Sequence, residues 1–173
     1  MDITLSYCQT KNGIIGVEDG LPYCIPPELS LFSRTSKYQI VVMGRKTWES
    51  PLVSKTKLKD RANFVLTKRL DSEPVRGVKY FDTPEKIVEH IARQSRFKDS
   101  GVFVVGGKET LEAFLPFANR SIVTTIYATS EGSCKSPEID YSEWDRTSTT
   151  NYMSHVEYRV CTSIYRRSKP VKH

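Results

Sequence analysis

The sequence predicts a single α/β domain over residues 1–173, with a mostly parallel central β-sheet, flanking helices and an antiparallel C-terminal hairpin. Strand-type and helix-type segments alternate through most of the chain, which favours parallel strands joined by helices. Residues 40–43 and 102–105 are wholly apolar, as in strands buried on both faces. Residues 147–152 and 156–165 are consecutive strand-type segments, which indicates the hairpin.

The first half of the chain alternates between apolar segments and breaks made by glycine or proline. Ile3, Leu5 and Tyr7 alternate with polar residues, which indicates a strand. The Pro26-Pro27 pair favours a helix start, and Gly44 ends an apolar strand. The expected elements are strands at 3–7, 40–43, 63–67 and 78–81, a long loop at 12–24, helices at 28–34 and around 47–48, a polar loop at 51–62 and a turn at 71–77.

The second half of the chain begins with the clearest sequence signal for the start of a helix. Asp82, Thr83, Pro84 and Glu85 combine a cap, a first-turn proline and an early acid. The expected elements are this helix with the apolar stripe Ile87, Val88, Ile91 and Ala92, a strand at 102–105 ended by Gly106-Gly107, a helix at 108–115 with Leu111, Phe114 and Leu115 inward, a strand at 121–127 and the closing hairpin.

Charge and composition leave several classes of partner open. Lys and Arg number 26 against 20 Asp and Glu, a formal charge of +6, and the cations lie in small dispersed groups, with residues 167–173 as a basic tail. This pattern suits a small polyanion such as a phosphorylated cofactor better than nucleic acid. We expect no membrane span, because no apolar run reaches the necessary length. We also expect no nucleic-acid binding, because the basic groups are dispersed and form no repeat with aromatic residues.

The cysteines and histidines point to no metal centre. None of the four cysteines forms a C-x-x-C pair, and no histidine has a ligand partner at a standard spacing. The N-terminus has an acid where a secretion signal would carry basic residues. We therefore expect a cytoplasmic protein with reduced thiols and no metal.

Two strand–glycine–helix junctions are candidates for anion binding. One is Met43-Gly44 followed by Arg45, and the other is Gly106-Gly107. Amides at a helix start can hold a phosphate, and parallel strands bring such junctions to one edge of the sheet. Neither junction is a P-loop or a G-x-G-x-x-G fingerprint. Considered alone, Gly106-Gly107 is slightly better explained as a tight turn, and Arg45-Lys46 also fits an ordinary surface pair.

Glu28 is the carboxylate with unusual neighbours. It follows Ile25-Pro26-Pro27 and precedes Leu29 and Phe32. The commoner use of such a residue is to complement the helix dipole in the first turn. The functional alternative is a partly buried acid with a raised pKa, able to bind a guanidine-like group.

An ordered set of motifs resembles dihydrofolate reductase. The set comprises Asn12–Gly16, Gly20–Tyr23, Pro26–Leu29, the highly specific Met43–Ser50, Arg61 and Asn63, Val104–Gly107 and Thr124. The resemblance runs from Met1 to about Trp144 and includes the closing strand near 158–166. It implies reduction of dihydrofolate to tetrahydrofolate, with hydride passing from NADPH to pterin C6 and a proton added at N5. It also implies service to one-carbon and thymidylate metabolism, binding of antifolates such as methotrexate or trimethoprim, and a monomer.

The resemblance also implies roles for individual residues. Residues 14–23 would form a mobile lid over the nicotinamide, and the Gly106-Gly107 peptide would be cis. The catalytic set is Glu28, Tyr23 and Thr124. The substrate would contact Tyr7, Leu29, Phe32, Leu58, Arg61 and Val105. The cofactor would contact Ile15, Gly16, Gly20, Leu21, Gly44, Arg45, Lys46, Thr47, Thr67, Lys68, Arg69, Gly106, Gly107, Lys108, Glu109 and Thr110.

Some positions depart from the family pattern and leave alternatives open. Tyr23 replaces the usual Trp, Leu111 replaces an aromatic residue, and Ser133-Cys134 stands in place of Gly-Asp. Three extra residues also lie between Ser50 and Arg61. The alternatives are a related pyrimidine reductase of riboflavin biosynthesis, against which Glu28 and Arg61 argue, and a catalytically weak folate- or NADPH-binding structural protein on the same scaffold.

Overall fold

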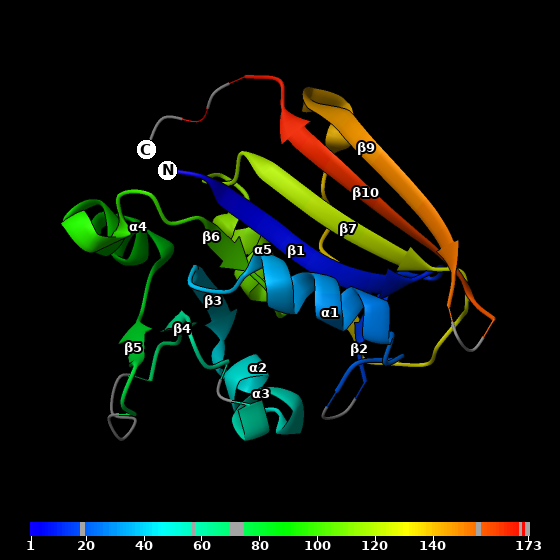
Figure 1. The fold of residues 1–173 in the computed structure, drawn as a ribbon, viewed down its shortest axis with the longest axis horizontal. Coiled ribbons are helices and arrows are strands. Elements are labelled where there is room, and N and C mark those ends of the chain that lie inside the picture. The colour runs from blue at the N-terminus through cyan, green and yellow to red at the C-terminus, as the bar shows by residue number, and fades with distance from the viewer. Residues whose placement is uncertain (18–19, 57, 70–74, 155–156, 170, 172–173) are drawn as a thin grey trace.

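One eight-stranded sheet forms the centre of the molecule (Figure 1). The computed structural model describes residues 1–17, 20–56, 58–69, 75–154, 157–169 and 171. The strand order is β5-β4-β3-β6-β1-β7-β10-β9. The strands are β1 (Ile3–Thr10), β3 (Ile40–Gly44), β4 (Ala62–Leu66), β5 (Val78–Phe81), β6 (Val102–Val104), β7 (Arg120–Ile126), β9 (Trp144–Met153) and β10 (Arg159–Arg167).

Strand directions confirm the predicted mixture. Every neighbouring pair from β5 to β7 is parallel, whereas β10 runs antiparallel to both β7 and β9. The wholly apolar β3 and β6 are adjacent, with Val42 opposite Val104. Residues Ile40 to Met43 and Val102 to Val104 are buried, as expected for strands covered on both faces. Their carboxyl ends therefore meet at one edge of the sheet.

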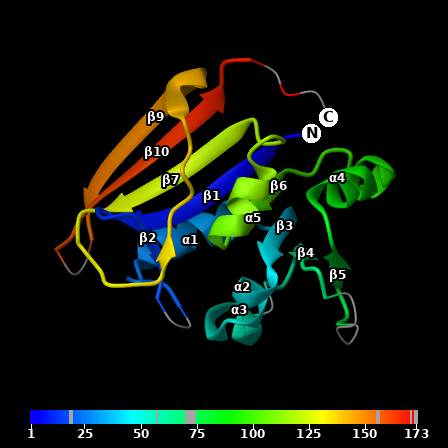
Figure 2. The same ribbon diagram turned by 180° about the vertical axis from the view of Figure 1, so that it is seen from behind.

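Helices cover both faces of the sheet. They are α1 (Pro26–Thr35), α2 (Arg45–Glu49), α3 (Pro51–Thr56), α4 (Pro84–Ala92) and α5 (Lys108–Phe114), with the short 3-10 helices η1 (Ser95–Phe97) and η2 (Tyr141–Glu143). Helix α1 crosses the face seen in Figure 1, and α5 lies on the opposite face, seen in Figure 2. The predicted cap of α4 is confirmed, because the Thr83 side chain accepts a hydrogen bond from the amide of Lys86.

Two expected loops contain regular structure. Residues 51–62 include α3, which begins at Pro51 and buries Val53. Residues 12–24 include β2 (Ile14–Gly16), which pairs with β8 (Cys134–Lys135). Both predictions of continuous loop were wrong. A helix of six residues carries too little periodicity to detect, and a two-stranded pairing between distant segments leaves no local signal.

Parts of five predicted segments lie outside the described residues. These are positions 18 and 19 of the expected loop at 12–24, position 57 of the expected loop at 51–62, positions 71–74 of the expected turn at 71–77, positions 155 and 156 at the hairpin, and positions 170, 172 and 173 of the basic tail. All four cysteines are described, and each is a free thiol. Among the described residues, no helix has the length and hydropathy needed to cross a bilayer.

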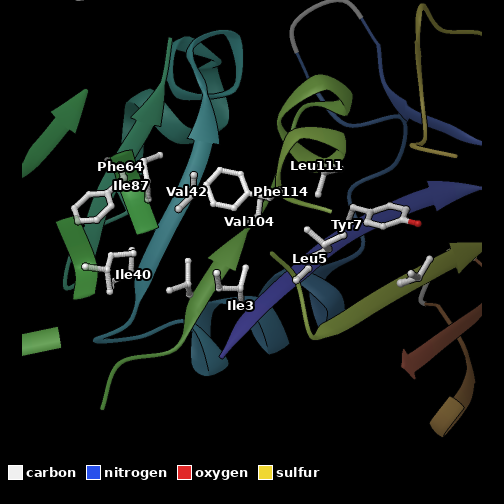
Figure 3. Close-up of a cluster of buried hydrophobic side chains, with 14 of the residues drawn as sticks. Ile3, Leu5, Tyr7, Ile40, Val42, Phe64, Ile87, Val104, Leu111 and Phe114 are labelled. Atoms are coloured by element: carbon white, nitrogen blue, oxygen red, sulfur yellow. The ribbon is translucent and has the colours of Figure 1, made fainter. Parts of the chain in front are cut away.

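The larger buried cluster fills the α5 side of the sheet. Figure 3 shows Ile3, Leu5 and Tyr7 of β1 on the same side as Leu111 and Phe114 of α5. Leu111 and Phe114 are fully buried, as predicted, whereas Leu115 is only half-buried. Side chains on a strand alternate between faces, so Ser6 and Cys8 point to the other side, where α1 lies. A smaller cluster around Met43, Trp48 and Val65 lies on the α1 side.

Replacing Phe114 with alanine should destabilise the fold strongly. The ring is 0% exposed and lies at the centre of the larger cluster, so its loss leaves a cavity. We expect the free energy of unfolding to fall by about 3–5 kcal/mol in urea denaturation. Tyr38→Ala is the control, because Tyr38 is 71% exposed and its loss should change stability little. An equal effect of the two variants would contradict the assignment of the core.

Candidate active site

Glu28 lies in the first turn of α1, on the sheet face opposite α5. Ile25 caps this helix, and prolines occupy its first two positions. Burial disfavours the ionised carboxylate and raises the pKa of Glu28 above its ordinary value. A hydrogen bond with the Thr124 side chain lowers that pKa again, by less. The Oε2 atom of Glu28 is buried and has no hydrogen-bond partner among the described residues. The carboxyl is therefore ready to accept a hydrogen bond from a ligand.

A row of small polar side chains lies beneath this carboxyl. Cys8 of β1 is opposite Thr124 of β7, and Thr124 is opposite Thr162 of β10. The hydroxyl groups of the two threonines are 2.9 Å apart and buried. The carboxyl also acts on Cys8, whose pKa is raised to about 12, first by burial and then by the charge of Glu28. The structure thus brings Thr124 to Glu28, as predicted.

The position of Tyr7 corrects one prediction. Its side chain points into the core on the α5 side, and its hydroxyl lies 3.4 Å from that of Tyr141. It lines a hollow of about 650 Å³ between β1 and residues 136–141, away from Glu28. The motifs predict substrate contact on the correct strand, β1, but at the wrong residue, because consecutive side chains on a strand point to opposite faces. Cys8 was missed, although the alternation of Ile3, Leu5 and Tyr7 could have indicated it.

Apolar side chains from three segments form the wall beside Glu28. Phe32, Leu58 and Val105 pack against the same small cluster, as their predicted shared role requires. Helix α1 has no fully buried residue, and Leu29 and Phe32 remain half-buried. An amphipathic helix normally covers its apolar face. The partly uncovered face of α1 therefore offers an apolar surface to a ligand that reaches Glu28.

Arg61 is held at the far end of α1. Its Nε donates to the hydroxyl of Ser36 at 2.9 Å, and its two terminal nitrogens donate to the carbonyls of Lys59 and Ser33, each at 2.7 Å. Its guanidinium carbon lies 5.9 Å from the centre of the Phe32 ring. An arginine carries five N–H donors, so this arrangement fixes the plane of the group and leaves donors for an anion.

The two glycine junctions lie side by side at the carboxyl ends of β3 and β6. Gly44 caps α2 and Gly107 caps α5, and neither helix start has a side-chain cap. The amide of Gly44 donates to the carbonyl of Gly106 at 2.7 Å, and the Gly106-Gly107 peptide is cis, as predicted. A Cβ atom on Gly44 would lie 2.7 Å from the Thr110 hydroxyl oxygen. Only glycine permits this close approach, which lets the two junctions pack against each other through their backbones.

Polar residues surround these junctions. Arg45 forms an ion pair with Glu49 at 2.7 Å, Lys46 is exposed, and the Thr47 hydroxyl lies toward Gly106 and Gly107. On α5, Lys108 pairs with Glu112 at 3.5 Å. The remaining predicted cofactor residues of this region lie at the same helix start or just after β4: Glu109 and Thr110 on α5, and Thr67, Lys68 and Arg69 in a turn where the Thr67 hydroxyl accepts from the Arg69 amide.

The predicted lid contains β2 and is tied to the segment around β8. Ile15 packs against the larger core cluster, and Gly20 exchanges two backbone hydrogen bonds with Val17. Leu21 is exposed, and residues 18 and 19 lie outside the described part. A Cβ atom on Gly16 would lie 3.2 Å from that of Cys134, and one on Gly132 would lie 2.6 Å from the Ile14 side chain. Close backbone packing therefore joins the two segments.

Tyr23 lies at the end of the predicted lid, and its hydroxyl forms a hydrogen bond within the protein. That hydroxyl donates to the carbonyl of Thr129 at 2.7 Å, and the ring meets Tyr158 edge-on at 4.9 Å. Burial raises the pKa of Tyr23, and Tyr158 raises it further. A tyrosine here thus anchors the lid to the β7–β8 connection. Its hydroxyl proton is not free to hold a water beside Glu28.

Among the described residues, no three His, Cys, Asp or Glu side chains lie close enough together to hold a metal ion. A second hollow, of about 380 Å³, lies beside β4, β5 and η1 and is lined by Phe64, Lys79 and Arg96 among others. The arrangement at Glu28 therefore suits acid chemistry on an apolar ligand that also reaches the glycine junctions.

Comparison with known proteins agrees with this geometry. The chain matches the family model described as dihydrofolate reductase over residues 2–167. It is 30% identical to a dihydrofolate reductase of Haemophilus influenzae over 148 residues, covering 84% of each chain, and 33% identical to dihydrofolate reductase HdrB of Haloferax volcanii over 142 residues, covering 79% of this chain and 71% of that one.

A solved structure extends the match to the whole fold. It is a dihydrofolate reductase from Enterococcus faecalis complexed with NADP(H) and RAB-propyl, with a TM-score of 0.84, 27% identity and 97% of each chain covered. The agreement extends over nearly the full length of both chains. The chain belongs to the dihydrofolate reductase family.

Proposed function

We infer that this chain reduces dihydrofolate to tetrahydrofolate with NADPH as the hydride donor, and that it binds antifolates at the same site. The observation that carries this function is the buried carboxyl of Glu28, whose Oε2 has no partner among the described residues, one turn before Phe32 of the apolar wall. A pterin has a flat ring system whose faces can pack against apolar side chains, with an amino group and a ring N–H along one edge. A carboxylate accepts both hydrogen bonds of such a pair.

Glu28 also suits the proton transfer at N5. Burial keeps its pKa raised, so the carboxyl holds a proton to higher pH than an exposed glutamate does. The carboxyl binds the pterin edge, and the proton at N5 is favoured through the pterin and a water. Cys8 and Thr124 close the floor of the pocket in this arrangement. We assign the contribution of β1 to Cys8 rather than to Tyr7, because Tyr7 points to the opposite face.

The glycine junctions fit a dinucleotide. Neither helix start has a side-chain cap, and Arg45, Lys46 and Thr47 supply donors beside Gly44, Gly106 and Gly107. When bound, NADPH supplies the hydride that adds to C6 of the pterin. Val105 belongs to the apolar wall and directly precedes Gly106, so it would lie where the two ligands meet. The lid excludes water from this region when it closes.

The charged tail of dihydrofolate matches Arg61. Its guanidinium plane is fixed by Ser33, Ser36 and Lys59 and lies at the end of the wall formed by Phe32. A planar fork binds a carboxylate through two parallel hydrogen bonds. The tail of the pyrimidine substrate in riboflavin synthesis carries no such carboxylate, so Arg61 favours folate.

We further propose that residues 1–173 act as one domain, as a monomer in the cytoplasm. The edge strand β9 is exposed over most of its length and polar, which discourages pairing with another chain. Four free thiols are typical of a reducing compartment. Size-exclusion chromatography with light scattering at assay concentration tests the monomer.

The first test follows the loss of NADPH absorbance with the purified protein. Oxidation that depends on dihydrofolate supports the proposed reaction. If NADPH and folate both bind and no oxidation occurs, the chain is a binding protein on the same scaffold. If neither binds, the proposed function is wrong.

Glu28→Gln should lower kcat at neutral pH by about a hundredfold or more, because the amide cannot hold the proton in the same way. In the wild-type protein, kcat should fall as the pH rises through the raised pKa of Glu28, since the protonated form becomes scarce. Binding of NADPH, measured by fluorescence titration, should be retained. Glu85→Gln is the matched control, an exposed first-turn glutamate of α4. Full turnover in Glu28→Gln would refute the role of Glu28.

Arg61→Lys should raise the KM for dihydrofolate about tenfold and change kcat little, because an ammonium group cannot form the paired hydrogen bonds. Steady-state kinetics at saturating NADPH measures both constants. Arg34→Lys, at the exposed end of α1, provides the control for the change of residue type. An unchanged KM would show that the charged tail of dihydrofolate does not bind at Arg61.

Replacing Lys68 and Arg69 together with glutamine should lower kcat/KM for NADPH about tenfold or more and leave that for NADH nearly unchanged. The two cations would hold the phosphate that distinguishes the cofactors, and that contact is lost. Assays with each cofactor in turn give the ratio. A parallel loss for both cofactors would indicate damage to the fold of the turn after β4.

A further inference from the structure

The second hollow, beside β4, β5 and η1, has no role in the proposed function. Its volume is about 380 Å³, and its lining comes from the first residues of β4 and β5, the residues just before them, and η1. Binding pockets for small molecules measure roughly 300–1,000 Å³. The hollow is therefore large enough to hold a small organic molecule.

This hollow lies apart from the proposed active site. Phe64 in its lining belongs to the larger buried cluster, and Figure 3 shows the Phe64 ring at the opposite end of that cluster from Tyr7. Glu28 lies on the other face of the sheet, beneath α1. Arg61 also lines the hollow, but all three of its guanidinium nitrogens already donate hydrogen bonds within the protein. A ligand in the hollow would therefore not occupy the pocket at Glu28.

Two aromatic rings give the hollow an apolar wall. Phe64 of β4 is 2% exposed, and Phe97 of η1 is half-buried. Their ring centres are 5.9 Å apart, and their planes meet at 79°. A third aromatic group, His90 of α4, meets Phe64 edge-on at 5.7 Å. Aromatic rings pack favourably against a further flat ring, so this wall suits an aromatic ligand.

Two cations line the same hollow. Lys79 of β5 lies opposite Phe64 in the parallel register, so both side chains leave the same face of the sheet. The guanidinium carbon of Arg96 lies 4.5 Å from the centre of the Phe97 ring. Among the described residues that line the hollow, none is acidic, and neither cation forms an ion pair within the described part of the chain. Two positive charges therefore lie at the hollow without a negative partner.

The imidazole of His90 holds one of these cations. Nζ of Lys79 lies 3.2 Å from Nε2 of His90. An ammonium group can only donate, so Nε2 accepts and the ring is neutral. Burial lowers the pKa of His90, and the charges of Lys79 and Arg96 lower it further. His90 thus fixes the position of Lys79 and responds to the charge of the hollow.

We propose that this hollow is a second ligand site, which binds an aromatic phosphate, that is, a phosphate monoester carried on a flat ring. The ring packs against Phe64 and Phe97. The phosphate carries nearly two negative charges at neutral pH, which match the charges of Lys79 and Arg96. The apolar wall and the cations lie in one hollow, so a single small molecule can contact both. The proposal does not depend on the proposed function.

The probe is phenyl phosphate, and the readout is the titration of His90 by proton NMR at constant ionic strength. The chain has three histidines, and His90→Gln identifies the signal. We expect saturating phenyl phosphate to raise the His90 midpoint by about half a pH unit, because its negative charge offsets Lys79 and Arg96. Phenol, which has the ring without the charge, should leave the midpoint unchanged. Inorganic phosphate should bind about tenfold more weakly, because it lacks the ring contact.

The double variant Lys79→Gln with Arg96→Gln should weaken phenyl phosphate binding about tenfold or more, followed through the His90 signal. The matched control is Arg93→Gln with Lys98→Gln. It removes the same charge from exposed residues at the ends of α4 and η1, outside the lining of the hollow. The control should keep the affinity of the unmodified protein.

Three results would overturn the proposal. The first is a His90 midpoint that phenyl phosphate does not move, and the second is equal affinity in the two double variants. The third is displacement of phenyl phosphate by NADPH, which would show binding at the glycine junctions. Equal affinity for inorganic phosphate would refute the aromatic ligand and leave a site for the anion alone. Binding that persists in a protein without reductase activity supports the second site and counts only against the proposed function.

Discussion

The parallel pairing of β3 with β6 is the constraint on which the rest of the site depends. Parallel strands place their carboxyl ends at the same edge, so Gly44 and Gly106 meet there and are joined by a backbone hydrogen bond. Both helices then start at this edge with uncapped amides. If either strand were reversed, one junction would move to the far edge and the proposed phosphate-binding surface would be divided.

The acid of the site is stabilised by a balance between opposing effects. Burial raises the pKa of Glu28, and Thr124 lowers it by less. The carboxyl can remain in an apolar position because small polar groups from three strands lie beneath it. The same face of the sheet carries no large side chain at Cys8 or Thr124, which leaves room for a flat ligand between α1 and the floor. The electrostatic environment of Glu28 and the shape of the proposed pocket therefore both depend on the small polar side chains of this sheet face.

The lid shows how the chain accommodates its departures from the family pattern. Tyr23 anchors its hydroxyl to Thr129, while Gly132 lets the chain before β8 approach Ile14 closely. The absence of the usual Asp at position 134 is thus accompanied by backbone pairing of β2 with β8 and by close glycine packing. These contacts join Ile14 and Gly16 to the segment around Cys134.

The sequence alone determined the strands, the helix starts, the glycine junctions and the role expected of Glu28, because these depend on local patterns and on motifs in order along the chain. It could not determine α3 or the β2–β8 pair, since short elements and distant pairings carry no periodic signal. The alternation along β1 separates Tyr7 from Cys8, but which of the two faces α1 covers was decided by packing. The row of Cys8, Thr124 and Thr162 beneath Glu28 was decided only by tertiary structure. Three segments far apart in the chain become neighbours there through sheet register and helix packing, and neither is encoded within any one segment.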